Sequence, residues 1–366
     1  MRILYCTSEA NPYAGSGGLA DVAASLPKTL RQRGIDCRVV MPLYGTIPQY
    51  LRDGMHYITN FTVPTAWRRQ YCGIFWAEYD GVTFYFIDNE YYFKRSGLYG
   101  FYDDAERFSF FSRAILEMLP YIDFHPDLIH TNDWQTALVP TYYYFFYSKN
   151  PWYYNIKSLY TIHNIQYQGM YGWEVNTECV GIPEDCTKML EMDGKLNMSK
   201  GAIETSTRVS TVSPSYAKEI LDPWFACGLD QILKHRAYKL CGILNGIDND
   251  SYNPATDFHM YANYTPEYPQ GKEECKRKLQ ERLCLAQRGD IPLIAMVTRL
   301  VSHKGLDLVR GGIEHILDNY DVQFVVLGSG DKEYEDYFWY LQNKYPGRVC
   351  FCHGYVPELA RKIYAG

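Results

Sequence analysis

Residues 1–41 read MRILYCTSEANPYAGSGGLADVAASLPKTLRQRGIDCRVVM. Ile3 to Cys6 is a short apolar run, and Cys37 to Met41 is a second. Between them, apolar residues recur at helical spacing from Leu19 to Leu30. This order predicts a strand, a helix and a second strand, the unit from which a parallel sheet covered on both faces is built. Pro27 falls inside the helical pattern and is expected to kink or break that helix.

The pattern changes further along the chain and then returns. Trp67 to Ile87 alternates and is rich in aromatic residues, which predicts an antiparallel excursion. A second series of strands and helices runs from Leu293 to Cys352. We therefore expect an α/β chain of two Rossmann-like domains, residues 1–244 and 248–366, the second with too few strand and helix steps to be complete.

The composition is typical of a folded, soluble protein. Of 366 residues, 47% are hydrophobic and 21% charged, and the net charge is −6. These values exclude general disorder and argue against sequence-independent binding to nucleic acid, which needs Lys and Arg to neutralise phosphates. No apolar run approaches the ~18–20 residues needed to span a bilayer, and the N-terminus lacks a signal-peptide core, so we expect no membrane association.

The eleven cysteines are scattered from Cys6 to Cys352 without the spacing of a metal finger. The closest pair, Cys350 and Cys352, points to one face of an expected strand. We interpret these residues as ordinary thiols of a reduced, cytoplasmic protein, with redox or metal chemistry as the alternative.

The loop from Gly15 to Asp21, GSGGLAD, lies at an expected helix start. Gly17 and Gly18 allow close backbone approach, and free N–H groups with the helix dipole favour an anion. The loop also fits G-x-G-x-x-A, a weak match to a dinucleotide-binding fingerprint because a long spacer separates it from the first strand. A plain loop and an NAD-dependent oxidoreductase are the alternatives.

Two cations, Arg299 and Lys304, follow an expected strand and precede an expected helix. Open α/β folds bind ligands at the carboxyl edge of the sheet, where these residues would lie. Together they could neutralise a diphosphate and stabilise its charge as a bond breaks. The alternative is a pair of solvated surface cations.

Polar residues also end two other expected strands, HTNDW at 130–134 and TIHN at 161–164. Asp133, His163 and Asn164 are therefore site candidates, although an isolated histidine is more often structural. No metal-ligand spacing surrounds either His130 or His163, so we expect no metal and no cofactor.

Two further stretches are interpreted as structural. Asp103, Asp104 and Glu106 are expected to form a solvated helix start, with a functional role as the alternative. The aromatic run from Tyr142 to Tyr147 is expected to be core rather than a platform for sugar rings.

Taken together, these segments resemble the bacterial glycogen synthase and plant starch synthase family. The stretches that carry the resemblance are ordered along the whole chain: SGGLADV (16–22), 104–111, HTNDW (130–134), TIHNIQYQG (161–169), GILNGID (242–248), 299–306, and Gly354-Tyr355.

The resemblance implies a GT-B glycosyltransferase, two Rossmann-like domains facing a cleft, that transfers glucose with retention to the non-reducing end of an α-1,4-glucan. ADP-glucose would be the donor, with UDP-glucose as the other choice, and no metal would be needed. By similarity, Arg299 and Lys304 would hold the diphosphate, His163 and Asn164 would lie against the glucose, and Asp133 would be a polar site residue near it. The remaining implied roles are ordering of the glycine loop by Asp21, adenine stacking by Tyr355 and lining of the cleft by Asn245.

The chain departs from the family pattern in two places. Gly15 stands where the K-x-G-G-L signature has lysine, and the chain ends before the family's acidic active-site motif. These departures leave a second hypothesis open, in which the chain is a catalytically impaired fragment that only binds glucan or nucleotide.

Overall fold

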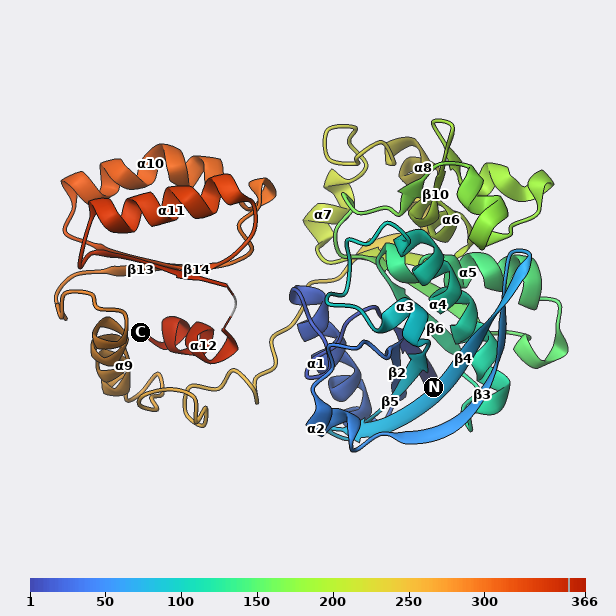
Figure 1. Ribbon diagram of the computed structural model, residues 1–366, viewed down its shortest axis with the longest axis horizontal. Coiled ribbons are helices and arrows are strands. Elements are labelled where there is room, and N and C mark those ends of the chain that lie inside the picture. Colours follow the sequence, from blue (N-terminus) through green and yellow to red (C-terminus); the bar gives the residue numbers. More distant parts are fainter. Residues whose placement is uncertain (355) are drawn as a thin grey trace. The chain divides into compact units, whose positions relative to one another are not determined.

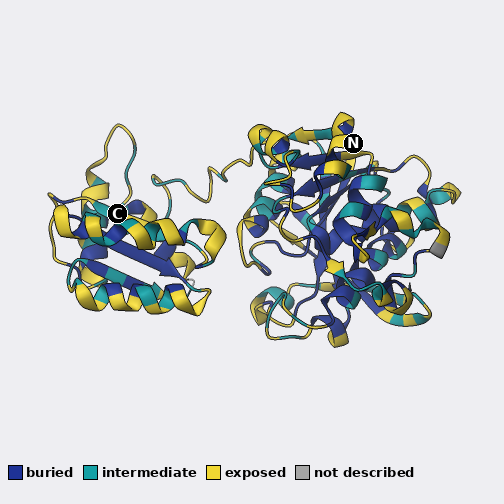
Figure 2. Ribbon diagram, turned by 90° about the horizontal axis from the view of Figure 1, so that it is seen from above, coloured by how far each residue is buried: buried dark blue, intermediate teal, exposed yellow. Residues whose placement is uncertain are grey.

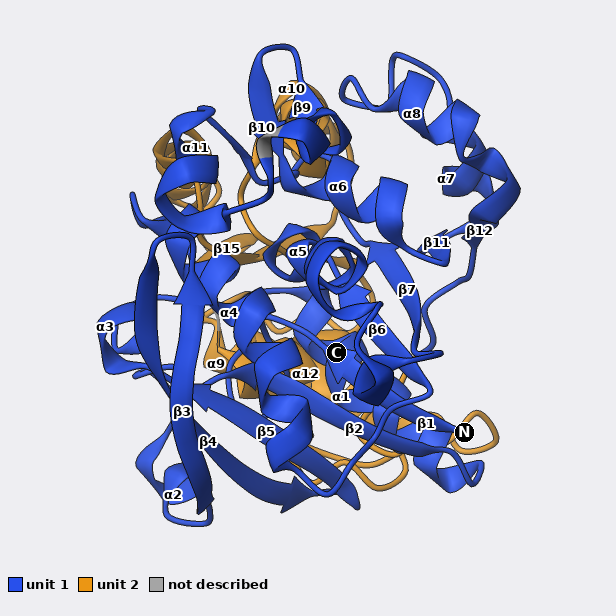
Figure 3. Cartoon of the chain, turned by 90° about the vertical axis from the view of Figure 1, so that its right-hand side faces the viewer, with its two compact units in different colours: residues 1–246 blue, residues 247–366 orange. Residues whose placement is uncertain are grey.

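The computed structural model describes residues 1–354 and 356–366, without the side chain of Glu184. The chain divides into two compact units, unit 1 from Met1 to Gly246 and unit 2 from Ile247 to Gly366 (Figure 3). Each unit is an α/β layer structure with its own sheet, which confirms the predicted fold class.

Unit 1 is built on a nine-stranded sheet in the order β12-β11-β7-β6-β1-β2-β5-β4-β3 (Figure 1). Pairing is parallel except at β3 with β4 and β4 with β5. The strands are β1 (Arg2–Cys6), β2 (Asp36–Pro42), β3 (His56–Thr65), β4 (Arg68–Tyr79), β5 (Val82–Asp88), β6 (Leu128–Asn132), β7 (Lys157–Ile162), β11 (Arg208–Thr211) and β12 (Leu240–Gly242). A small second sheet joins β8 (Met170–Tyr171), β10 (Lys195–Asn197) and β9 (Glu191–Met192). The antiparallel excursion predicted over 67–87 is therefore confirmed in β4 and β5, and β3 extends it beyond the predicted range.

Helices cover this sheet and bury its central strands (Figure 2). They are α1 (Gly18–Gln32), α2 (Gln49–Arg52), α3 (Glu90–Phe93), α4 (Asp104–Met118), α5 (Leu138–Tyr142), α6 (Met198–Thr205), α7 (Pro214–Glu219) and α8 (Asp230–His235). The predicted break at Pro27 is wrong, because α1 continues through it with Pro27 on the buried face beside Ala23. Burial of that face offsets the one backbone hydrogen bond that proline removes.

The aromatic run after α5 forms a π-helical turn from Tyr143 to Tyr147. Tyr142 and Tyr147 are buried in the core, as predicted, whereas Tyr144 and Phe146 face solvent. The run is therefore core along one side only, because a helical turn presents its residues to opposite sides.

Unit 2 has a three-stranded parallel sheet in the order β13-β14-β15, with β14 fully buried. Helices α10 and α11 pack on one face, and α9 and α12 on the other (Figure 1). The elements are α9 (Gln270–Arg282), β13 (Leu293–Val297), α10 (Leu306–Asn319), β14 (Gln323–Gly328), α11 (Lys332–Lys344), β15 (Val349–His353) and α12 (Pro357–Ala365). This is the second strand and helix series that the sequence predicts. Within the described residues of both units, no helix is long and apolar enough to cross a membrane.

Candidate active site

The carboxyl ends of β6 and β7 are joined through one carboxylate. Asp133, the first residue after β6, accepts the backbone N–H of His163 at 2.8 Å and that of Asn164 at 3.3 Å through Oδ1. Its own N–H donates to the carbonyl of Thr161 at 3.0 Å. Asp133 has φ 55° and ψ −177°, a backbone region that is almost exclusive to glycine. The two strand ends are thus held in one fixed arrangement that brings three predicted site residues together.

The imidazole of His163 has a defined tautomer. Its Nε2 lies 2.9 Å from Oδ1 of Asn132. The Asn132 amide nitrogen donates to the carbonyl of Cys6 at 3.0 Å, so Oδ1 is the acceptor and Nε2 carries the proton. Tyr5 donates to the same oxygen at 3.0 Å. Neutral His163 therefore keeps Nδ1 as a lone-pair acceptor.

Burial acts on both ionisable groups of this cluster. It raises the pKa of Asp133, against the pull of His163 and of the two amides that donate to the carboxylate. It lowers the pKa of His163, against the attraction of Asp133. Both shifts favour the neutral forms, so the cluster is suited to hydrogen bonding with an uncharged polar ligand such as a sugar.

His130 belongs to the scaffold behind this cluster. It is buried, and its Nε2 lies 2.7 Å from the hydroxyl of Thr161, which lies 2.7 Å from the hydroxyl of Ser210. This row crosses β6, β7 and β11. Burial and then His163 lower the pKa of His130 to about 3, so it is a neutral structural residue.

The glycine loop leaves the same sheet edge, because β1 lies beside β6 in parallel register. Glu9 Oε2 accepts the backbone N–H of Ser16 at 2.6 Å and its hydroxyl at 2.8 Å. Asp21 Oδ1 accepts the side-chain amide of Asn11 at 2.8 Å. The loop is therefore braced from both ends by carboxylates.

Gly17 and Gly18 face open space. A Cβ atom on either residue would meet no atom within 4 Å. Neither packing nor backbone conformation requires glycine at Gly17, whose φ of −172° suits any residue. Their bare backbone leaves room in front of the helix for a ligand.

Gly15 is different, because its surroundings are filled. A Cβ atom at this position would lie 2.7 Å from Cβ of Ala20 and 2.8 Å from Oδ1 of Asn11. The present path of the loop thus depends on glycine at position 15. The departure from the K-x-G-G-L signature therefore affects the backbone of the loop as well as its charge.

Tyr99 and Glu9 were missed by sequence reasoning. The hydroxyls of Tyr99 and Ser8 lie 2.7 Å apart, which ties the 94–103 loop to the residues that precede the glycine loop. Burial raises the pKa of Tyr99, with further contributions from Glu9 and Asp133, so the three side chains share one region. A carboxylate just ahead of a glycine loop could have indicated Glu9, whereas no pattern in the sequence marks Tyr99.

The expectation of a solvated helix start at Asp103, Asp104 and Glu106 is wrong. The Asp103 side chain is 6% exposed and pairs with Arg95 at 2.7 Å. Asp104 pairs with the fully buried Arg107, and it accepts the N–H of Gly100 at 2.8 Å. Glu106 pairs with Arg68 at 2.9 Å. Asp103 and Asp104 are buried and Glu106 is half-buried, and each has a cation beside it.

In unit 2, Arg299 and Lys304 lie beyond the carboxyl end of β13. Both are exposed, and among the described residues neither has a carboxylate partner. Burial, and then the charges of Lys304 and Arg299, lower the pKa of His303, so the two cations lie near an imidazole that is favoured in its neutral form. Gly328 and Gly330 fit closely beneath it, since a Cβ atom on them would lie 2.0 Å from the carbonyl oxygen of Thr298 and 2.2 Å from that of Leu300.

Asn245 is not part of these clusters and is exposed at the end of unit 1. Tyr355 lies outside the described residues. Within the described part of the chain, no group of three or more His, Cys, Asp or Glu side chains is arranged to hold a metal ion.

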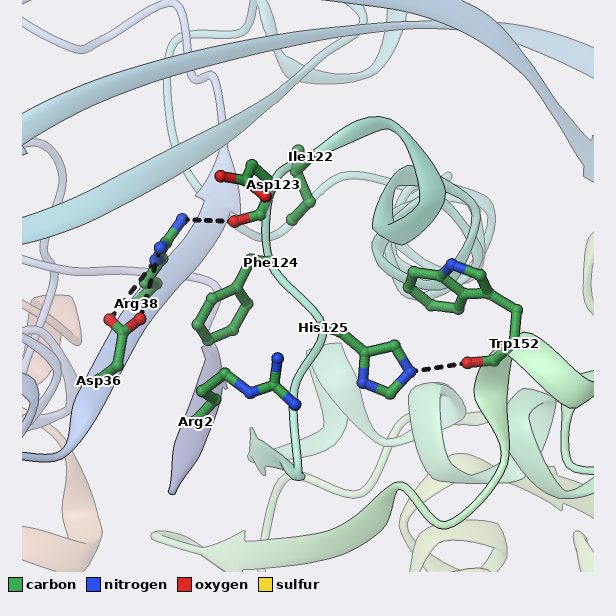
Figure 4. A pocket seen from close by; sticks show the side chains of 8 residues that line it. All are labelled: Arg2, Asp36, Arg38, Ile122, Asp123, Phe124, His125 and Trp152. Atoms are coloured by element: carbon green, nitrogen blue, oxygen red, sulfur yellow. Dashed lines mark hydrogen bonds and ion pairs between the residues drawn. The ribbon is translucent and has the colours of Figure 1, made fainter.

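A separate cavity of about 240 Å³ opens at the amino ends of β1 and β2 (Figure 4). Several of its polar side chains have partners: Arg38 binds Asp36, and His125 Nε2 donates to the carbonyl of Trp152 at 2.7 Å. Since Asp133 and His163 follow the carboxyl ends of parallel strands, this cavity belongs to the opposite edge of the sheet.

Comparison with known proteins points to one family. A model of the starch synthase catalytic domain matches residues 2–235. The glycogen synthase of Bacillus cereus (strain B4264) is 48% identical over 370 aligned positions, which cover 100% of this chain and 77% of that protein. The glycogen synthase of Desulforamulus reducens is 47% identical, with 100% and 76% covered.

A solved structure agrees with the sequence relatives. The catalytic domain of starch synthase IV from Arabidopsis thaliana, bound to ADP and acarbose, matches with a TM-score of 0.92 and 33% identity, covering 100% of this chain and 76% of that one. The match identifies the fold as that of a GT-B catalytic domain.

Proposed function

The chain belongs to the starch synthase catalytic domain family and is a hexosyltransferase of glycogen or starch synthesis. We propose which of its residues bind its two substrates. Its substrates are a nucleotide sugar and a glucan. We propose ADP-glucose as the donor, an α-1,4-glucan as the acceptor, and the cytoplasm as the location. The ADP bound to the similar starch synthase IV supports the choice of donor. The alternative of a protein that only binds these ligands is not favoured.

The cluster of unit 1 is assigned to the glucosyl group. The single observation that carries this assignment is the contact of Asp133 with the N–H groups of His163 and Asn164, which fixes three polar residues at one sheet edge. The neutral imidazole of His163 and the amide of Asn164 would bind sugar hydroxyls. Asp133 would act chiefly by holding both in place.

We assign the glycine loop to the region of the substrates where negative charge develops during transfer. Gly17 and Gly18 leave open space at the start of α1, and the positive end of the helix dipole favours an anion there. Asp21, through Asn11, would hold the loop in shape.

Arg299 and Lys304 are assigned to the diphosphate of the donor. In a retaining transfer, glucose leaves the diphosphate while positive charge builds on the sugar ring, so stabilising the leaving group lowers the barrier. Two exposed cations without carboxylate partners can supply that charge without first breaking an ion pair. Tyr355 would stack on the adenine and Asn245 would line the space between the substrates, two roles that rest on the resemblance.

The test combines turnover and binding. Transfer of labelled glucose from ADP-glucose to glycogen, and the heat of ADP-glucose binding, would be measured for the wild type, Arg299→Ala and Lys304→Ala. The matched control is Lys278→Ala, which removes an exposed cation of α9. We expect each site variant to lose at least about tenfold in turnover, since a charge-assisted contact contributes roughly 1.5–3 kcal/mol. Unchanged turnover and binding in both variants would contradict the assigned roles.

A further inference from the structure

Two thiols of unit 2 are in contact. The Sγ atoms of Cys350 and Cys352 lie 3.8 Å apart on β15. They are two residues apart on a strand, so both side chains point to the same face. Their partners in the register are Val325 and Leu327 of β14, on the face that α9 and α12 cover. Both cysteines are half-buried.

The other cysteines are arranged differently. Five are buried: Cys6, Cys37, Cys72, Cys179 and Cys275. In unit 1, Cys227 and Cys241 are exposed and Cys186 is half-buried. Cys284, also exposed, lies close enough to raise the pKa of Cys350, which makes it the one competitor to consider among the described thiols.

The two sulfurs of the pair are not equivalent. The hydrogen bond from Cys350, and then the positive charge of Arg282, lower the pKa of Cys352. The same hydrogen bond raises the pKa of Cys350. A thiol of lowered pKa beside a second thiol is the arrangement found in redox-sensing cysteines, in which the first attacks and the second resolves.

Strand geometry sets the character of a bond between them. Residues i and i+2 of a strand have Cα atoms about 6.4–6.8 Å apart, the upper end of the range that disulfides span. A disulfide here would be strained and therefore easily reduced. β15 is an edge strand of the described sheet, paired only with β14, which leaves it freer to adjust than a central strand.

We propose that Cys350 and Cys352 form a redox-active dithiol, which low-molecular-weight disulfides oxidise reversibly to a disulfide within β15. The Cys352 thiolate attacks one sulfur of the disulfide RSSR, forms a mixed disulfide and releases RS⁻. Cys350 then loses its proton to solvent and attacks Sγ of Cys352, which forms the protein disulfide and releases the second RS⁻. Two thiols are oxidised, and the two electrons reduce RSSR to two RSH. This modification site is independent of the substrate assignments above.

The test uses the full chain in oxidised glutathione, followed by alkylation and mass spectrometry. We expect the wild type to lose two alkylation sites, with a cross-linked peptide that contains 350 and 352, and to regain both in excess reduced glutathione. Cys350→Ser should instead accumulate glutathione on Cys352. Cys352→Ser should react at least about tenfold more slowly at position 350.

Two controls decide whether this pair is responsible. Cys284→Ser and Cys241→Ser should both still form the disulfide at the wild-type rate. Loss of the disulfide in Cys284→Ser, or a wild type that stops at a stable glutathione adduct, would overturn the proposal. If a serine variant fails to fold, phenylarsine oxide on the wild type gives the answer: protection of both 350 and 352 from alkylation supports the pair, and protection of neither contradicts it.

Discussion

Oδ1 of Asp133 accepts the backbone N–H of His163 at 2.8 Å, across the carboxyl ends of two adjacent strands. The contact places a carboxylate beneath the backbone of the residue assigned to the sugar, rather than beside its imidazole. The imidazole is oriented separately by Asn132. Position and tautomer of His163 therefore depend on two different partners, which mutation can separate.

Asp133→Ala and Asp133→Gly distinguish the carboxylate from the backbone. Both remove the acceptor and should reduce glucosyl transfer at least about tenfold, because the His163 and Asn164 amides lose the hydrogen-bond partner that holds them in place. Glycine also relieves the strain of φ 55°, so Asp133→Gly should be more stable than Asp133→Ala by about 1 kcal/mol. Urea unfolding of the two variants checks this, and equal stability would show that position 133 is unstrained.

His130 makes stability depend on pH. Its pKa is lowered to about 3 in the folded protein from 6.5, so the unfolded chain takes up the proton first as the pH falls. The stability that neutral His130 provides is complete above pH ~6.5 and is lost toward pH ~3, by about 2 kcal/mol between pH 6.5 and 5. His130→Gln should lose correspondingly less over that interval in urea unfolding. Exposed His56→Gln is the control, and it should follow the wild type.

Asp104 and Arg107 should behave as a coupled pair. Arg107 is fully buried and also donates to the carbonyls of Tyr92 at 2.7 Å and Leu98 at 3.2 Å. Asp104→Asn should cost about 3–5 kcal/mol, because it leaves a buried charge without its partner. Arg107→Met combined with Asp104→Asn should cost less than the sum of the two single changes, by about 1–3 kcal/mol. A strictly additive double-mutant cycle would be inconsistent with the ion pair.

Gly15→Ala and Gly17→Ala test the two kinds of glycine in the loop. A methyl group at 15 meets Ala20 and Asn11, so Gly15→Ala should lose about 1–3 kcal/mol of stability. A methyl group at 17 meets nothing, so stability should stay within about 0.5 kcal/mol. Donor binding, measured calorimetrically, should nevertheless weaken in Gly17→Ala if substrate fills that space. If both variants bind the donor as tightly as the wild type does, the loop is not a binding element.

Glu9→Ala should loosen the glycine loop. The carboxylate accepts two hydrogen bonds from Ser16, and loss of one charge-assisted bond, roughly 1.5–3 kcal/mol, should speed local amide exchange at 16–18 at least about tenfold. Hydrogen exchange followed by mass spectrometry measures this directly. Exchange in α11, which belongs to the other unit, should stay unchanged and serves as the internal reference.

The sequence predicted the strand and helix order well, because the apolar patterns of β1, α1, β2 and unit 2 are regular. It also predicted Asp133, His163 and Asn164 as site candidates at two strand ends, and the structure brings the three together because parallel strands end at one edge. It did not predict the burial of Asp104. Its partner Arg107 is only one turn away in α4, but that arginine is buried by contacts with the carbonyls of Tyr92 and Leu98, which lie outside the helix. Tyr99 was missed for the same reason: its bond to Ser8 joins segments 91 residues apart.

Asp133 shows how such a site can be located without relatives. Its backbone conformation is one that glycine adopts freely, while its amide partners require a carboxylate, so the local preferences disagree. In natural sequences such conflicts between local preferences are rare, and they are found mainly at functional or strained sites. A search for non-glycine residues of positive φ would therefore have selected this strand end as one of seven positions among the described residues, before any substrate was considered.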